Sequence, residues 1–326
     1  MIKKLAFLLV SIWGLAGLSV RAQDPHFSQF YANPLYLNPA FAGVAKCPKV
    51  HLNYRNQYPT LGVYQTFSAS YDQYFDGIRG GLGFLVLRDE AADGTLSLTE
   101  ASAMYSYHLK VNRKFSILAG FQATFRQRAL DNTGLTFPDQ IEPFYGFVRP
   151  TAEVLENTTN QHLDLTFGFL GYTERFYFGG VVSHLTEPNE AFLTESKLPR
   201  KYTFHAGATI PLGKRRLYNT TQNMLIPHVV YQQQSTAFQL TAGLSFNRGP
   251  ITGGLALRHG NANPDALVLI VGFAPDNIPW TIGYSYDYTI SNLTNALGGA
   301  HEISLSYRFP CPQKRKRREA IKCPKF

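Results

Sequence analysis

Charged residues are scarce in this sequence of 326 residues. Asp, Glu, Lys and Arg together make up 16% of it, whereas soluble globular domains usually contain about a quarter. Long apolar runs are scarce too: after the N-terminal region the sequence contains no stretch of about eighteen apolar residues, the length that a transmembrane helix requires. The composition therefore excludes helical membrane spans in the main part of the chain and is unusual for a soluble surface.

Motifs of well-known enzymes are missing as well. The sequence contains no Gly-x-x-x-x-Gly-Lys loop, no His-Glu-x-x-His pair and no Gly-x-Ser-x-Gly elbow. Their absence excludes the usual signatures of phosphate-loop enzymes, zinc proteases and α/β-hydrolases. We therefore expect no catalytic residues, no cofactor and no metal site.

The first 22 residues have the pattern of a secretory signal peptide. Lys3 and Lys4 precede a short apolar run over 5–18, and Val20-Arg21-Ala22 supplies small residues before a cleavage site. We predict cleavage between Ala22 and Gln23, so that the mature chain is exported.

Aromatic residues are abundant, with 19 Tyr and 24 Phe. Many of them alternate with polar residues, as in the run over 299–309, where every second residue from Ile303 to Phe309 is apolar and the residues between are polar. Side chains alternate between the two faces of a strand, so this run predicts a strand with one apolar and one polar face. In an outer-membrane barrel the apolar face meets lipid and the polar face lines the lumen.

Fourteen runs of this kind follow one another along the chain. We predict strands at 48–57, 62–75, 78–89, 95–109, 114–130, 161–173, 175–186, 199–213, 223–234, 236–247, 250–260, 264–275, 278–290 and 299–309. An even number of strands and a partial alternation of short and long connections are typical of bacterial outer-membrane barrels. The sequence therefore predicts an all-β transmembrane barrel of about 14 antiparallel strands with both termini in the periplasm. The long connection over 131–160 is the best candidate for an external partner contact or an inward lid, with a variable solvated loop as the alternative.

This barrel divides the chain into four parts. After the signal peptide (1–22), residues 23–46 contain two Asn-Pro pairs that interrupt regular structure, and we expect them to plug the lumen or pack under its rim. Residues 47–309 form the barrel. Residues 310–326 form a basic periplasmic tail with a net charge of +6, so the overall net charge of +9 does not indicate nucleic-acid binding.

The sequence contains three cysteines, Cys47, Cys311 and Cys323, and none is in a Cys-x-x-Cys pair. Closure of the barrel would bring Cys47 and Cys311 to the same rim, within reach of a disulfide. A bridge between Cys311 and Cys323 is the alternative. Five histidines lie in strand-like runs, and we expect them to be lumen or rim side chains rather than ligands: His108, His184, His205, His228 and His301.

Several short motifs resemble those of one known family, and they occur in the family's order over nearly the whole mature chain. They are Gln23–Tyr31, Asn38–Gly43, Tyr54–Pro59, Ser70–Gln73, Ser183–Asn189, Leu198–Tyr202 and His301–Phe309. The sequence thus resembles the PorP/SprF family of type IX secretion system outer-membrane proteins. The resemblance implies a non-catalytic role in secretion or surface anchoring of a particular large secreted protein, such as a gliding adhesin.

The partners that the resemblance implies are a secreted cargo with a C-terminal sorting domain and periplasmic secretion components, beside the lipid of the outer membrane. The alternative is a transporter of small hydrophobic molecules, because long-chain fatty-acid transporters also have fourteen strands and an N-terminal plug. The polar lumen faces argue modestly against such a transporter.

Overall fold

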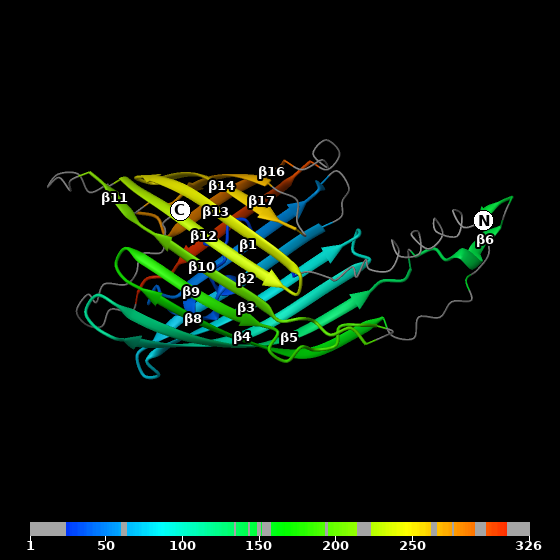
Figure 1. Cartoon of the computed structure of the whole chain (residues 1–326), viewed down its shortest axis with the longest axis horizontal. Coiled ribbons are helices and arrows are strands. Elements are labelled where there is room, and N and C mark those ends of the chain that lie inside the picture. The colour runs from blue at the N-terminus through cyan, green and yellow to red at the C-terminus, as the bar shows by residue number, and fades with distance from the viewer. Residues whose placement is uncertain are drawn as a thin grey trace, which may run out of the picture.

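The computed structural model describes residues 24–59, 64–133, 135–142, 144–148, 151, 158–192, 195–213, 223–261, 266–275, 277–290 and 298–311. Within them the chain forms a closed antiparallel barrel of fourteen strands (Figure 1), with β11 continuing β10 after a one-residue break at Thr209. The predicted signal peptide, the predicted cleavage site at Ala22 and Gln23, and residues 312–326 of the predicted tail lie outside the described residues.

The barrel strands follow each other around the wall in chain order. They are β1 (Lys49–Gln57), β2 (Tyr64–Phe75), β3 (Gly80–Ala91), β4 (Leu96–Lys110), β5 (Ser116–Leu130), β8 (Thr159–Tyr172), β9 (Phe176–Ser183), β10 (Lys201–Ala208), β11 (Ile210–Leu212), β12 (Asn223–Gln234), β13 (Ala237–Arg248), β14 (Ile251–Gly260), β15 (Ala266–Phe273), β16 (Trp280–Thr289) and β17 (Ala300–Arg308). Pairing of β1 with β17, from Lys49 opposite Arg308 to Gln57 opposite Ala300, closes the wall. The predicted barrel is confirmed, and each predicted strand range overlaps one wall strand.

Two predicted boundaries differ from the structure for local reasons. The strand predicted over 175–186 ends at Ser183, because His184 has a φ of 58° and turns the chain inward. The strand predicted over 199–213 is interrupted at Thr209, because this part of it faces Pro227 of β12, which has no amide hydrogen to donate.

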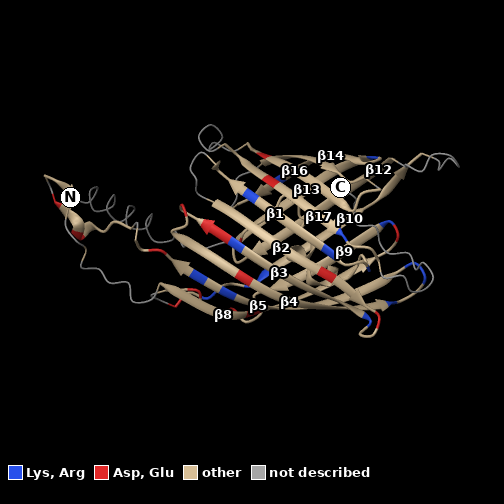
Figure 2. Ribbon diagram, turned by 180° about the vertical axis from the view of Figure 1, so that it is seen from behind, with Lys and Arg blue, Asp and Glu red and all other residues tan. Residues whose placement is uncertain are grey.

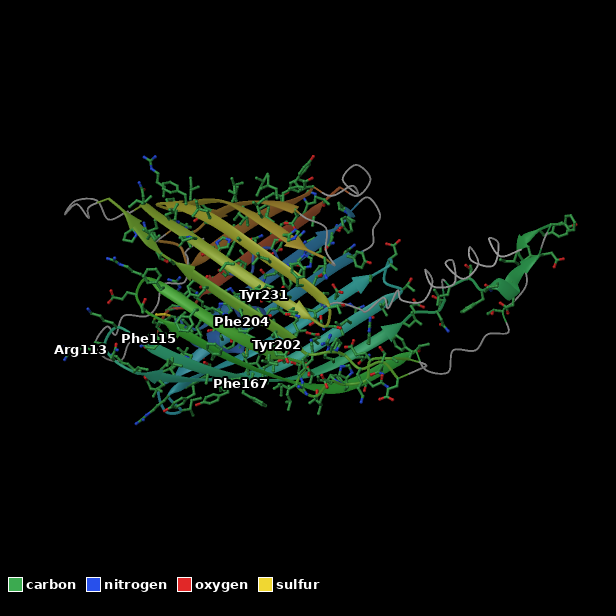
Figure 3. The ribbon with its side chains drawn as sticks, viewed as in Figure 1. Arg113, Phe115, Phe167, Tyr202, Phe204 and Tyr231 are labelled. Atoms are coloured by element: carbon green, nitrogen blue, oxygen red, sulfur yellow. A yellow bond between two sulfur atoms is a disulfide. The ribbon has the colours of Figure 1, made fainter. Side chains whose placement is uncertain are left out.

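Side chains alternate across the wall as the polar and apolar pattern predicts. In β2, Ser68 and Ser70 are buried in the interior, whereas Phe67 points outward and is 45% exposed. Figure 3 labels further outward aromatic side chains on β8 and β10, Phe167 and Phe204, which are about half exposed. The outer surface is therefore apolar around the barrel, and this is the surface that lipid covers in an outer-membrane barrel.

The N-terminal segment, Asp24–Lys46, lies inside the barrel. It contains a short helix, α2 (Pro34–Leu37), and a 3-10 turn, η1 (Pro39–Phe41). Each begins with proline after asparagine, and the Asn38 side chain accepts from the amide of Ala40, as an N-cap does. The hydrophobic core of the molecule is the contact between this segment and the wall, where Leu35 packs against Leu85 and Met104.

We call the end of the barrel where β1 starts and β17 finishes the terminal rim, and the opposite end the long-loop rim. Beyond the long-loop rim, η3 (Pro138–Gln140), β6 (Ile141–Glu142) and β7 (Gly146–Phe147) form a small hairpin that projects away from the barrel (Figure 1). The described part of this connection therefore does not form an inward lid, which was one of the hypotheses for residues 131–160. Among the described residues, no helix is long and apolar enough to span a membrane.

Candidate functional site: a lumen occupied by the N-terminal segment

Buried ion pairs hold the start of the N-terminal segment. The first group, which we call the Arg55 cluster, consists of Arg55, Arg258, Asp287 and Glu302 from β1, β14, β16 and β17. The Arg55 guanidinium lies 2.7 Å from an Asp287 carboxylate oxygen and 3.1 Å from a Glu302 oxygen, and Arg258 lies 2.8 Å from Asp287. All four side chains are buried, and two positive and two negative charges balance, as burial of charge requires.

The N-terminal segment supplies further hydrogen bonds to the Arg55 cluster. The backbone amides of Ser28 and Gln29 donate to the two Glu302 carboxylate oxygens over 2.7 and 3.0 Å. The Ser28 hydroxyl donates to Asp287 over 2.7 Å, and the Gln29 side chain donates to the backbone carbonyl of Glu302. The segment thus fills acceptor positions that would otherwise be buried without partners.

A second group, which we call the Arg126 cluster, consists of Arg126, Glu100, Glu190, His184 and Asp164. It binds Asp24 on the other side of the lumen. The Arg126 guanidinium lies 3.2 Å from Asp24, 3.1 Å from Glu100 and 3.4 Å from Glu190. The His184 ring contacts Asp24 through Nε2 and Asp164 through Nδ1, both at 2.7 Å. The cluster therefore joins the N-terminal segment to β4, β5, β8 and the 184–200 connection.

The charge state of His184 follows from these contacts. Burial alone would lower the pKa of His184, but the Asp24 and Asp164 carboxylates outweigh it and raise the pKa to about 9. Burial likewise opposes ionisation of Asp24, yet the neighbouring His184, Lys201 and Arg126 lower the pKa of Asp24 well below its usual range. At neutral pH this contact is an ion pair.

Glycines in the wall allow the segment to approach very closely. A Cβ atom on Gly120 of β5 would lie 2.6 Å from the Cα atom of Ala40, and one on Gly81 of β3 would lie 2.6 Å from the Cα atom of Gly43. Real Cβ atoms essentially never come that close to backbone. Small residues at these inward positions are therefore a requirement of the occupied lumen.

Hydrogen bonds continue along the segment to its end. The side-chain amide of Asn33 donates to the Ser68 hydroxyl, and that of Asn38 donates to the backbone carbonyl of Phe169. The backbone amide of Gly43 donates to the Asp72 carboxylate, and all three bonds are 2.9 Å long. A cavity of about 40 Å³, bounded in part by Asp24 and Arg126, leaves room for a few water molecules. The segment is bonded to opposite sides of the wall and fills the lumen at these positions.

The structure places most of the predicted site residues. Cys47 and Cys311 are joined in a disulfide at the terminal rim, with their Cα atoms 4.5 Å apart, and Cys323 lies outside the described residues. His205 and His228 are buried toward the lumen, the His108 ring donates to the carbonyl of Ala42, and His184 belongs to the Arg126 cluster. His301 lies near the long-loop rim, beside Tyr284.

The sequence alone does not identify the members of the two clusters as partners. A signal was present, because Arg55, Arg126, Asp164, Asp287 and Glu302 are charged residues on strand faces made mostly of uncharged residues. Which of them meet depends on barrel closure and on the path of the N-terminal segment. In the described part of the chain, no group of three or more His, Cys, Asp or Glu residues is arranged to hold a metal ion.

A closed antiparallel barrel with an apolar exterior and a polar, occupied lumen defines an outer-membrane β-barrel protein. Residues 19–307 match the model of a family described as type IX secretion system membrane protein PorP/SprF. The chain belongs to the PorP/SprF family, and it is an outer-membrane component of type IX secretion.

Solved structures give weaker similarities. A mutant of the monoaromatic hydrocarbon channel TodX is 10% identical with a TM-score of 0.48, and covers 84% of this chain and 93% of its own. The KdgM porin is 9% identical with a TM-score of 0.36, and the match covers 80% of this chain and 99% of the porin. A mutant porin of Rh. blastica is 7% identical with a TM-score of 0.36, and the match covers 81% of this chain and 99% of that porin. A search of curated proteins found no match.

Proposed function

We propose that this barrel supports secretion or surface anchoring of one large secreted protein by binding it, without catalysis. Its partners are the C-terminal sorting domain of that cargo and periplasmic components of the secretion system. The barrel holds the assembly in the outer membrane, and the cargo crosses the membrane elsewhere.

The observation that carries this proposal is the occupied lumen. The N-terminal segment bonds to strands on opposite sides of the wall, from β1 and β17 to β5 and β8. A folded cargo domain cannot share this space. A barrel of fourteen strands that is filled in this way serves as an anchor rather than as a conduit for a protein.

The long-loop rim offers contact surfaces for such a partner. In the projecting hairpin, Phe144 is 90% exposed and Tyr145 is 79% exposed, and aromatic side chains of this kind are common anchors in protein interfaces. The hairpin projects away from the barrel (Figure 1), so it lies beyond the apolar outer surface and in water.

A strand edge near the hairpin offers a second surface. β8 pairs with β5 from Thr159 to Tyr172, but with β9 only from Phe167 to Tyr172. Among the described residues, Thr159–Gln161 therefore has no neighbouring strand on its β9 side, whereas the Leu163 carbonyl accepts from the Thr186 hydroxyl. An edge of this kind can accept an added strand from a partner.

The test is a pull-down of the tagged full-length protein, extracted in detergent from its native outer membrane, with mass spectrometry of the co-purifying proteins. We expect one large secreted protein with a sorting domain, or periplasmic secretion components. The double variant Phe144→Ser, Tyr145→Ser should lose the secreted protein. The control Val111→Ser, Ile278→Ser changes two half-exposed apolar residues at the terminal rim and should retain it.

Two outcomes would contradict the proposal. Recovery of the barrel alone with bound lipid or fatty acid would favour the transporter of small hydrophobic molecules. Equal recovery of the secreted protein with both double variants would remove the hairpin from the binding surface.

A further inference from the structure

The terminal rim is strongly basic. Seven exposed cationic side chains lie on its turns and strand ends: Arg79, Lys110, Arg113, Lys114, Arg175, Arg248 and Arg308. Lys46 and Lys49 add two partly buried cations. The acidic residues in the described part of this rim are the exposed Asp76 and Glu174 and the buried Asp72. Figure 2 shows the blue turns at this end of the barrel.

The seven exposed cations have no ion-pair partner within the described chain. Arg308 and Lys49 even stand opposite each other in the β1–β17 pair, and like charges in that position repel. An external anion would relieve this repulsion.

The long-loop rim has the opposite character. Its described loops carry seven acidic residues, Asp93, Asp131, Asp139, Glu142, Glu187, Glu190 and Glu195. Their two basic residues, Lys197 and Arg200, are both ion-paired, with Glu195 at 3.6 Å and Glu187 at 3.5 Å. The unpaired positive charge of the described rims is therefore confined to one end of the barrel.

The position of the cations identifies the class of anion. They lie directly beyond the outward apolar side chains at the same rim, such as Phe176, Phe178 and Trp280, each about half exposed. Figure 3 shows Arg113 at the tip of a turn next to Phe115, whose ring stacks on Phe178 with centroids 6.4 Å apart. Where such an apolar band ends, lipid headgroups begin.

We propose that the terminal rim binds the phosphate groups of anionic phospholipids. Arginine and lysine side chains are suited to phosphate oxygens, and each basic residue near an anionic bilayer adds to the attraction. Binding would hold the terminal rim at a phospholipid leaflet. In an outer membrane this is the periplasmic leaflet, which agrees with the predicted periplasmic position of both termini.

The test compares lipid retention by matched variants of the full-length protein. Arg113→Gln, Lys114→Gln, Arg175→Gln removes three cations from two adjoining turns, since β5 pairs with β8. The control Arg88→Gln, Lys197→Gln, Arg200→Gln removes three cations associated with the long-loop rim. Both sets are solvent-exposed, and unchanged heat-modified migration on a gel verifies that each variant is folded.

Each protein is reconstituted into vesicles of equal phosphatidylglycerol and phosphatidylcholine, extracted, and analysed by native mass spectrometry. We expect wild type and control to retain phosphatidylglycerol preferentially, and the terminal-rim variant to lose about threefold or more of this preference. Molar salt during extraction should weaken the preference. Equal retention of both lipids by wild type, or the same preference in both variants, would overturn the proposal and leave the proposed cargo binding untouched.

Discussion

Substitution of Arg55 by methionine tests whether the Arg55 cluster holds the folded barrel and its N-terminal segment together. The Arg55 side chain is 2% exposed and bonds to Asp287, Glu302 and the Ser28 hydroxyl. In the variant, Asp287 keeps Arg258 at 2.8 Å. Glu302 loses the one cation that contacts it among the described residues and keeps the amides of Ser28 and Gln29.

The magnitude follows from the unpaired carboxylate. Removing one partner of a buried ion pair typically costs about 3–5 kcal/mol. The remaining amide donors lessen the charge penalty on Glu302, so we expect a loss of about 3 kcal/mol in the free energy of unfolding. A second substitution, Glu302→Gln in the same chain, removes the unpaired charge and should recover part of this loss.

Urea unfolding in lipid vesicles, followed by tryptophan fluorescence, measures the difference. Arg88→Met is the matched control, because Arg88 bonds only to Glu90 in the described structure, is 55% exposed in its side chain, and should cost about 0–1 kcal/mol. A change below about 1 kcal/mol for Arg55→Met would refute the reasoning, since a buried pair would then behave like a surface pair.

Three further predictions concern the N-terminal segment and its end. Gly120→Leu should displace the segment at Ala40 and make it sensitive to protease, whereas Gly253→Leu, where a Cβ meets no atom within 4 Å, should not; equal protection would contradict the close approach. The pKa of His184 is raised to about 9 from its usual 6.5, so the contribution of this ion pair to stability is full below about pH 6.5 and is lost as pH rises through about 9. Hydrogen exchange near Asp24, corrected for the intrinsic exchange rate, should therefore increase between pH 7 and pH 10 in wild type but not in His184→Gln. Non-reducing peptide mapping should find Cys47 linked to Cys311, and a Cys311–Cys323 peptide or three free thiols would contradict it.

Much of the fold could be predicted because its signal is local. The alternation over 299–309 reports the two environments of β17 directly: Glu302 is buried in the lumen and Ile303 is half exposed on the outer surface. Turns between strands are equally local, and the fourteen wall strands follow from them. The predicted ends of β9 and β10 were less accurate, because the positive φ of His184 and the break at Thr209 depend on contacts with residues distant in the sequence.

The lumen contacts could not be predicted in the same way. Arg55 and Glu302 are separated by 247 residues and meet only because β1 pairs with β17. The partners of Asp24 come from β5, β10 and the connection after β9. The sequence indicated that residues 23–46 pack in or under the barrel, but the choice between these positions depends on the volume that the closed wall leaves free.

Single-channel conductance in a planar bilayer tests the central claim, that the N-terminal segment occupies the lumen and makes the barrel an anchor. The full-length protein should show no steady ion conductance, and a variant lacking residues 24–46 should conduct through the vacated polar lumen. Steady conductance of the full-length protein equal to that of the deletion variant would contradict the account.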